Sequence, residues 1–146
     1  MTDANAALPH RFSLRVYYED TDAGGIVYYA NYLRYAERAR TELLRDLGVE
    51  SSRLMADDGI ALTVRHCAVD YRKPAVLDDR LTVETELTRI GGATLEAVQT
   101  VRRDDEDLVR IDLRLGCMSM RGGAARMPAA LRERLAAYLN SDTHWE

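Results

Sequence analysis

A short stretch of acidic residues and glycines is the part of the sequence best equipped for chemistry. Glu19, Asp20 and Asp22 lie within four residues, and Gly24 and Gly25 follow almost directly. A carboxylate can act as a general base or as a nucleophile, and glycines let a ligand approach the backbone closely. The residues alone are equally compatible with an acidic loop that caps a helix, with Asp22 as the cap.

A helix is expected soon after this stretch. Residues 31–48 carry apolar side chains at helical spacing, with Asn31 expected as the N-cap and Gly48 at the C′ position. Glu37 and Arg40, three residues apart on this helix, could pair with each other. The apolar stripe consists of Leu33, Ala36, Leu43, Leu44 and Leu47, widened by Tyr32, Tyr35 and Ala39. The first amides of a helix lack intrahelical acceptors, so a carboxylate and oxyanion donors would meet at this junction.

The histidines and cysteines do not support a competing mechanism. His10 and His144 fall in the expected terminal segments, and His66 falls in the apolar phase of an expected strand, which predicts a packed side chain. Cys67 and Cys117 are too few for a disulfide framework and are expected to be buried thiols. No serine or cysteine lies in a nucleophile elbow, and no phosphate-binding glycine motif occurs. We therefore expect neither a metal site nor a cofactor.

The rest of the sequence predicts an α+β domain with one long helix. A strand is expected at 11–18 and a short helical turn at 51–58. Period-two alternation then predicts four strands, at 60–72, 80–90, 93–103 and 108–120, with a turn at Gly91–Gly92 and an acidic hairpin tip at 104–107. A last helix led by Pro128 is expected to end near Leu139. Such a sheet is expected to curl around the long helix, and its uncovered edge favours an oligomer.

Composition is typical of a single globular domain. The chain has 146 residues with 20 basic and 24 acidic side chains, and this net charge of −4 argues against a nucleic-acid binder. No apolar run approaches the ~18 residues of a membrane span, and the N-terminus lacks the features of a secretory signal. We expect a cytoplasmic protein without membrane insertion. Residues 1–10 are expected to be flexible, residues 11–139 to form one domain, and residues 140–146 to be a tail.

The stretch from Arg15 to Gly48, RVYYEDTDAGGIVYYANYLRYAERARTELLRDLG, resembles the signature of the 4-hydroxybenzoyl-CoA thioesterase family. Within that family the chain is most similar to the Tol-Pal system-associated acyl-CoA thioesterases. The segment YRKPAVLDD at 71–79 and the helix led by Pro128 also fit, so the resemblance covers residues 11–139. It implies a hotdog fold, in which a curled antiparallel sheet surrounds one long central helix and a short helix ends the chain. It also implies a homodimer or a homotetramer, with the active site at a subunit interface.

The resemblance further implies hydrolysis of an acyl-CoA thioester to a free acid and CoA. The family's catalytic aspartate is the second of a D-x-D motif, which falls on Asp22, as base or nucleophile. A backbone amide at the start of the long helix, which falls on Tyr29, would hold the thioester carbonyl. Relatives often have histidine at this position, so the Tyr29 ring is expected to shape the acyl pocket. Gly25, Tyr28 and Asn31 are the substrate-binding candidates of the same loop.

Coenzyme A carries phosphates, so basic residues are expected along its path. The candidates are Arg65, Arg72, Arg89 and Arg121, with Lys73 and Arg126 as further possibilities, although solvated strand faces carry the same residue types. Two other functions stay open at this point. A non-catalytic acyl-CoA or acyl-carrier-protein binding module would have no need of Asp22, and a hotdog dehydratase would need a histidine in the loop.

Overall fold

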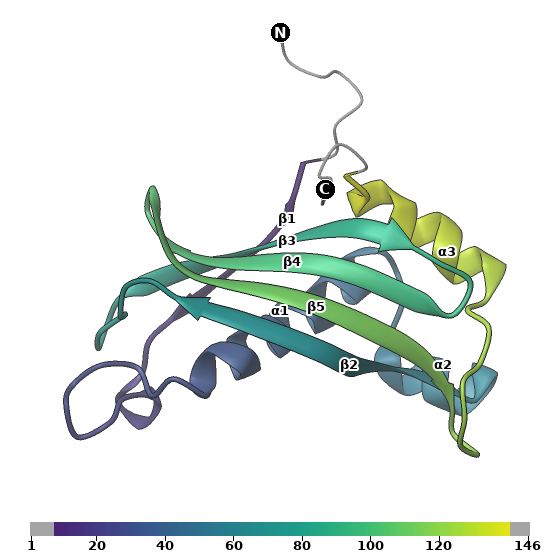
Figure 1. Cartoon of the computed structure of the whole chain (residues 1–146), viewed down its shortest axis with the longest axis horizontal. Helices are drawn as coiled ribbons and strands as arrows, with labels where there is room; N and C mark the ends of the chain where they lie inside the picture. The colour runs from purple at the N-terminus through teal and green to yellow at the C-terminus, as the bar shows by residue number, and fades with distance from the viewer. Residues whose placement is uncertain (1–7, 141–146) are drawn as a thin grey trace, which may run out of the picture.

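Five antiparallel strands form one sheet in the order β1-β3-β4-β5-β2 (Figure 1). The computed structural model describes residues 8–140, so most of the expected lead-in and tail, with His144, lies outside the described residues. The strands are β1 (His10–Arg15), β2 (Ile60–Tyr71), β3 (Arg80–Ile90), β4 (Thr94–Arg103) and β5 (Glu106–Ser119). The helices are α1 (Asn31–Asp46), α2 (Ser51–Asp58) and α3 (Ala129–Leu135), with 3₁₀ turns η1 (Tyr18–Asp20) and η2 (Ala136–Tyr138). None of the helices within residues 8–140 is long and apolar enough to cross a membrane.

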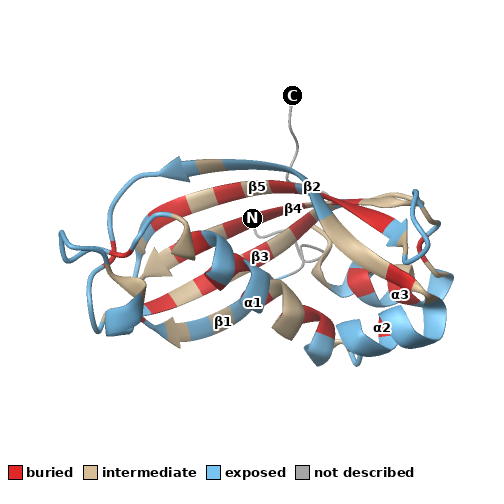
Figure 2. Ribbon diagram, turned by 90° about the horizontal axis from the view of Figure 1, so that it is seen from below, coloured by how far each residue is buried: buried red, intermediate tan, exposed pale blue. Residues whose placement is uncertain are grey.

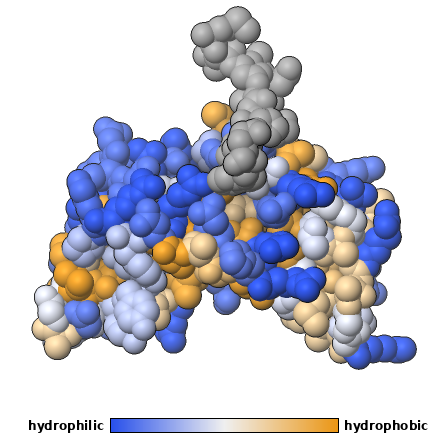
Figure 3. Space-filling view, in the orientation of Figure 1, coloured by the Kyte–Doolittle hydropathy of each residue, from blue (hydrophilic) through white to orange (hydrophobic). Residues whose placement is uncertain are grey.

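The long helix α1 packs on the inner face of the curled sheet, against β1, β3 and β4. This is the predicted hotdog arrangement. On β3 the inner face carries Leu81, Val83 and Leu87, as the alternation predicted, and all three side chains are buried. The face of the sheet turned toward the viewer in Figure 3 is mostly hydrophilic. The apolar faces of β3, β4 and β5 are therefore buried on the helix side, as expected for a sheet with one solvated face.

The core under α1 consists of two apolar clusters separated by a polar layer. One cluster surrounds the first half of α1 and the other surrounds its second half. Along the inner face of β4, Gln99 lies between Val101 of the first cluster and Ala97 of the second. Along β3, Thr85 has the equivalent position. This division could not be predicted from the sequence, because a buried glutamine on a strand gives no signal in an alternating pattern.

The polar layer is held by hydrogen bonds that use the whole amide of Gln99. Its Nε2 donates to the carbonyl oxygen of Ala36 at 2.9 Å and to Oγ1 of Thr85 at 3.0 Å. Its Oε1 accepts from the Arg40 guanidinium at 2.9 Å. Arg40 thus binds Gln99 and forms no ion pair with Glu37 within 4 Å. Because every polar atom of the Gln99 side chain has a partner, its burial carries no unsatisfied group.

The sequence predicted the C-terminal end of α1 correctly but not its N-cap. The helix begins at Asn31 with Ala30 as the N-cap, so the predicted Asn31 cap is wrong. Leu33 was assigned to the apolar stripe, but it is 41% exposed because it lies one position beyond the buried face. The C-terminal prediction is confirmed: Gly48 has a φ of 80° and follows the C-cap Leu47.

The Gly48 terminus provides a stability prediction. Its amide donates to Arg45 and the next amide, of Val49, donates to Leu44, which is the paired pattern of a Schellman motif. Gly48→Ala should lower the free energy of unfolding by about 1–2 kcal/mol, because a Cβ disfavours the left-handed conformation. Urea denaturation measures this change. Gly48→Asn should cost less, and equal losses for the two variants would contradict the explanation.

A bulge and the edge position of β2 each overturn one prediction. The pairing of β2 with β5 shifts between Val64 and His66, which leaves Arg65 as an extra residue. Beyond a bulge the alternation of inner and outer side chains reverses. His66 is consequently on the outer face and exposed, so the packed histidine is wrong. Cys67 falls on the inner face but is exposed, because β2 is an edge strand that α1 does not cover, whereas Cys117 is buried as predicted.

Two segments expected in loops belong to strands. His10 was assigned to the lead-in, but it begins β1, is buried, and has its Nε2 at 2.7 Å from Oδ2 of Asp46. The acidic hairpin tip is shorter than predicted, since only Asp104 and Asp105 lie between β4 and β5. Asp104 has a φ of 53°, which a tight two-residue hairpin turn requires.

The strand β2 is an uncovered edge of the sheet. It has 12 residues, pairs only with β5 within the described chain, and is exposed along most of its second half (Figure 2). Val64 and Tyr71 on its helix-facing side are 46% and 45% exposed. A long edge strand with accessible backbone groups and apolar side chains is a surface that can pair with another strand.

Candidate active site

The acidic stretch forms a tight loop between η1 and α1. Thr21 and Val27 pair as an isolated bridge, and the Asp22 amide donates to the Ile26 carbonyl at 2.9 Å. The Gly25 amide donates a hydrogen bond to the Asp22 carbonyl at 3.0 Å. Gly25 has a φ of 82°, so the turn needs a residue without a Cβ at this position. The loop is therefore closed on itself by its own backbone.

The Asp22 side chain is exposed on this loop and only partly used by the protein. Its Oδ1 accepts from the Gly24 amide at 2.8 Å, which fixes the carboxylate above the turn. Its Oδ2 has no hydrogen-bond partner among residues 8–140. Asp22 does not cap a helix, because α1 begins nine residues later. The interpretation as a capping loop is thereby removed, and one carboxylate oxygen stays available to a ligand.

The neighbouring Asp20 has a different position. Its Oδ2 accepts from the Tyr17 amide at 2.9 Å, and its carbonyl accepts from the Tyr28 amide at 2.9 Å. The same carbonyl accepts from Nδ2 of Asn31 at 2.9 Å. Asn31 therefore fastens the loop to the first turn of α1 instead of capping the helix. Burial and the negative charge of Asp20 raise the pKa of Tyr35, which lies beneath the loop.

Two backbone amides stand free just ahead of α1. The amides of Tyr29 and Ala30 donate to no acceptor within the described part of the chain. The Tyr29 carbonyl, by contrast, accepts from the Tyr71 hydroxyl at 3.2 Å, which ties this segment to the end of β2. These amides lie at the positive end of the α1 dipole, where an anionic oxygen is stabilised.

Three tyrosine rings cluster at the segment that carries the free amides. The Tyr29 ring lies 4.9 Å from that of Tyr28 and 6.1 Å from that of Tyr71, measured between centroids. A hydrogen bond with Tyr29 and the charge of Tyr29 raise the pKa of Tyr28. Burial is the main cause that raises the pKa of Tyr71, and the charge of Tyr29 adds to it. Both phenols are therefore protonated at neutral pH. They can donate hydrogen bonds or supply apolar surface, but they are not bases.

The structure separates the four basic candidates. Arg72 directly follows Tyr71 at the loop end of the sheet, where its Nε binds Asp70 at 3.0 Å. Arg65 lies in the bulge of β2, and Arg89 and Arg121 lie at the far ends of β3 and β5. Because β4 is antiparallel to both of its neighbours, β3 and β5 run in the same direction, and both end on the side of the sheet opposite the loop. Within one chain, only Arg72 is brought close to it.

Two further cations, on the helix that follows the loop, were not predicted from the sequence. Arg34 and Arg38 are exposed on the first turns of α1, and neither forms an ion pair within residues 8–140. Their spacing of four residues on the polar side of the helix was the signal that could have found them. Among the described residues, no cluster of three or more His, Cys, Asp or Glu side chains could hold a metal ion.

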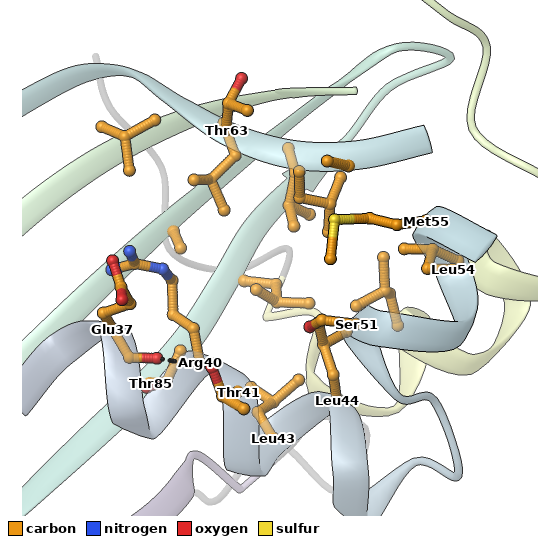
Figure 4. A pocket seen from close by; sticks show the side chains of 18 residues that line it. Glu37, Arg40, Thr41, Leu43, Leu44, Ser51, Leu54, Met55, Thr63 and Thr85 are labelled. Atoms are coloured by element: carbon orange, nitrogen blue, oxygen red, sulfur yellow. Dashed lines mark hydrogen bonds between the residues drawn. The ribbon is translucent and has the colours of Figure 1, made fainter. Parts of the chain in front are cut away.

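A cavity of about 510 Å³ opens beside the second half of α1 (Figure 4). Its walls come from α1, α2, the first part of β2 and the inner face of the sheet. The lining residues are Glu37, Arg40, Thr41, Leu43, Leu44, Ser51, Leu54, Met55, Ala61, Leu62, Thr63, Val64, Thr85, Leu87, Leu95, Ala97, Leu115 and Leu135. None of the candidate site residues from the sequence lines it. The chain thus has a reactive loop at one end of α1 and an apolar cavity at the other.

Comparison with known protein families shows where this arrangement belongs. The model of the thioesterase-like superfamily matches residues 16–135, which include the loop, all three α-helices and every strand except β1. The chain belongs to the thioesterase-like superfamily.

Individual members of this superfamily are similar to the chain over most of their length. The acyl-CoA thioesterase YbgC of Haemophilus influenzae is 44% identical over 109 residues, which are 75% of this chain and 80% of that protein. The acyl-CoA thioester hydrolase YbgC of Escherichia coli O157:H7 is 46% identical over 99 residues, or 68% of this chain and 73% of that protein. A probable thioesterase from Bartonella henselae superposes with a TM-score of 0.80 at 34% identity, over 82% of this chain and 99% of that one. This superfamily member is a thioester hydrolase, as the resemblance predicted.

Proposed function

We propose that this thioesterase hydrolyses acyl-CoA thioesters, with Asp22 as the catalytic carboxylate and the Tyr29 amide as the oxyanion donor. The observation that carries the proposal is the loop itself. It presents one unpartnered carboxylate oxygen of Asp22 together with the free amides of Tyr29 and Ala30, next to the N-terminus of α1. The names of the relatives from Haemophilus influenzae and Escherichia coli support the acyl-CoA substrate. A pure binding module would have no use for the free carboxylate oxygen.

Two reaction courses fit these groups. In the first, Oδ2 of Asp22 accepts a proton from water and the hydroxyl attacks the thioester carbon. The C–S bond then breaks, and the leaving CoA thiolate takes up the proton from Asp22. In the second, the carboxylate attacks the carbon itself and expels CoA, and water then hydrolyses the mixed anhydride to free acid and aspartate. In both, negative charge develops on the carbonyl oxygen, and the Tyr29 amide stabilises it.

The other groups of the loop would position the substrate. Gly25 would keep the turn free of a side chain, so that the thioester can approach. The Tyr28 and Tyr29 rings would line the path of the acyl group, while Asn31 holds the loop against α1. For the CoA phosphates, Arg72 is the best-placed sequence candidate, and Arg34 and Arg38 are alternatives on α1. Arg65, Arg89 and Arg121 would take part only if a second subunit brought them to the loop.

The edge strand β2 supports an oligomer. A second copy that paired with it would extend the sheet across the two subunits and bring its own side chains to the helix-facing side of β2. We propose a homodimer or a dimer of dimers for this reason. A cytoplasmic location is proposed from the sequence features given above, and an association with the Tol-Pal system is proposed from the resemblance.

The test of the function is the release of free CoA thiol from a panel of acyl-CoA substrates by the purified protein. We expect hydrolysis of at least one substrate, and its loss in Asp22→Asn. A folded protein that binds acyl-CoA but hydrolyses no member of the panel would refute the proposal and favour a binding module.

Substitution of Asn31 is expected to have a smaller effect on kcat/KM of the same reaction. Asn31→Ala removes the hydrogen bond to the Asp20 carbonyl, which is worth about 0.5–1.5 kcal/mol. We expect kcat/KM to fall about 3- to 10-fold, because the loop would lose part of its alignment with the free amides. The Asp22 carboxylate stays in place, so activity should not disappear. A loss as large as that of Asp22→Asn, or no change in kcat/KM, would contradict the positioning role.

A further inference from the structure

The walls of the cavity are mainly apolar, with polar side chains from Glu37, Arg40, one serine and three threonines. Eight of the 18 lining residues are leucines, and none is aromatic. Three of the hydroxyl groups are committed to the protein: Thr41 donates to the Glu37 carbonyl, Thr63 donates to a carbonyl of β5, and Thr85 accepts from Gln99. A ligand that fills the cavity therefore has to be apolar along most of its length.

One wall of the cavity is polar and fixed. Arg40 contributes this wall, and Gln99 holds its guanidinium from behind. Since Gln99 and Thr85 belong to the layer between the two core clusters, the cavity does not continue into the first cluster. Figure 4 shows Glu37 and Arg40 on one side of the cavity and Met55 of α2 on the other. Among the lining residues of α1, Glu37 and Arg40 are therefore the ones nearest the loop.

Exposed side chains on α1 and β2 extend from the reactive loop toward Glu37 and Arg40. On α1, the exposed Leu33 precedes Glu37 by four residues and lies on the same side of the helix. On β2, Tyr71 touches the loop through its hydrogen bond to Tyr29, and Cys67 follows on the same face of the strand. From Asn31 to Glu37 the helix rises about 9 Å, at ~1.5 Å per residue.

We propose that the cavity receives the distal part of a long, unbranched aliphatic acyl chain, so that this enzyme favours long-chain over short-chain or aromatic thioesters. The proposal rests on the proposed function, in which the thioester is held at the Tyr29 amide. A short or aromatic acyl group anchored there ends before Glu37 and gains nothing from the cavity. A cavity of ~150 Å³ accommodates benzene, or about 25 Å³ per carbon, so the 510 Å³ here hold at most about 20 carbons.

The experiment measures kcat/KM for the CoA thioesters of butanoate, octanoate, dodecanoate, hexadecanoate and benzoate. Each methylene that enters the cavity should raise kcat/KM about fourfold, which corresponds to ~0.8 kcal/mol. We expect the best long-chain substrate to exceed both butanoyl-CoA and benzoyl-CoA by about 30-fold or more. A preference of the wild type for butanoyl-CoA or benzoyl-CoA would overturn the inference while leaving the proposed function intact.

A variant that fills the cavity tests the location. Ala97 lines the cavity and is 2% exposed, so Ala97→Leu should lower kcat/KM for the longest good substrate about 10-fold and leave butanoyl-CoA within twofold. Ala56→Leu, the same enlargement on the exposed side of α2, is the matched control and should change neither value. If Ala97→Leu does not fold, Met55→Trp at the partly exposed mouth replaces it. An equal loss for all chain lengths would contradict the assignment.

Binding of free dodecanoate, measured by calorimetry, separates this inference from the catalytic proposal. Dodecanoate binding by the wild type and its loss in Ala97→Leu would support the cavity assignment even if no thioester were hydrolysed. Hydrolysis that is independent of chain length, without dodecanoate binding, would refute the cavity assignment and leave the thioesterase proposal standing.

Discussion

Asp22→Asn is expected to lower kcat/KM for acyl-CoA hydrolysis about 1000-fold, within the ~10²–10⁴ range of a lost general base. Asparagine keeps an oxygen that can accept from the Gly24 amide, so the turn retains its shape. What disappears is the negative oxygen that has no partner among the described residues. The loss should therefore fall on the chemical step. Stopped-time assays of CoA thiol release, with the same substrate for both proteins, measure it.

Two variants of the same loop make this prediction specific. Glu19→Gln neutralises an exposed carboxylate three residues earlier and should stay within about twofold of the wild type. Tyr29→Ala removes the ring but keeps the backbone amide, so it should cost less than about 10-fold. A Tyr29→Ala loss as large as the Asp22→Asn loss would refute the amide as the oxyanion donor.

The second large effect concerns the core beneath the catalytic half of α1. Ile111 on β5 is fully buried in the first cluster and faces Gln99 of β4 and Val69 of β2. Ile111→Ala should lower the free energy of unfolding by about 3–4 kcal/mol, from lost burial and from the cavity left behind. For a chain of this size the thermal midpoint should fall by roughly 10 °C. Urea and thermal denaturation give the two values.

Leu77→Ala is the matched control for this substitution. Leu77 lies in the connection between β2 and β3 and is 43% exposed, so a similar loss of aliphatic carbon should cost less than about 1 kcal/mol. Equal destabilisation by both variants would mean that the position of Ile111 under α1 is not the source of its effect.

The elements could be predicted closely because their patterns are local. Alternation placed a strand at 80–90, which is the observed range of β3, and helical spacing with Gly48 placed the end of α1 within two residues. The loop was also found from sequence, since acidic residues and glycines ahead of a helix are unusual there. Its details were not predictable, because the free Asp22 oxygen and the free Tyr29 amide depend on backbone hydrogen bonds that side-chain identity does not reveal.

The failures come from features that break a pattern. The bulge at Arg65 reverses the alternation of β2, so the positions of His66 and Cys67 could not be read from the residues before it. The cavity arises between elements far apart in sequence, and its polar wall needs Arg40 and Gln99, which are 59 residues apart. Distances between elements depend on how strands from different parts of the chain pair, and no local spacing encodes that pairing.

The polar layer of Gln99 and Thr85 has a consequence for how this protein can change. It separates the half of the core that supports the loop from the half that surrounds the cavity. Substitutions in the two halves share few neighbours, so their effects on folding should add nearly independently. Selection, or a designer, could then resize the binding half for a new substrate without retuning the reactive half. A single polar row across a hydrophobic core would in this way make one small domain behave as two separately adjustable parts.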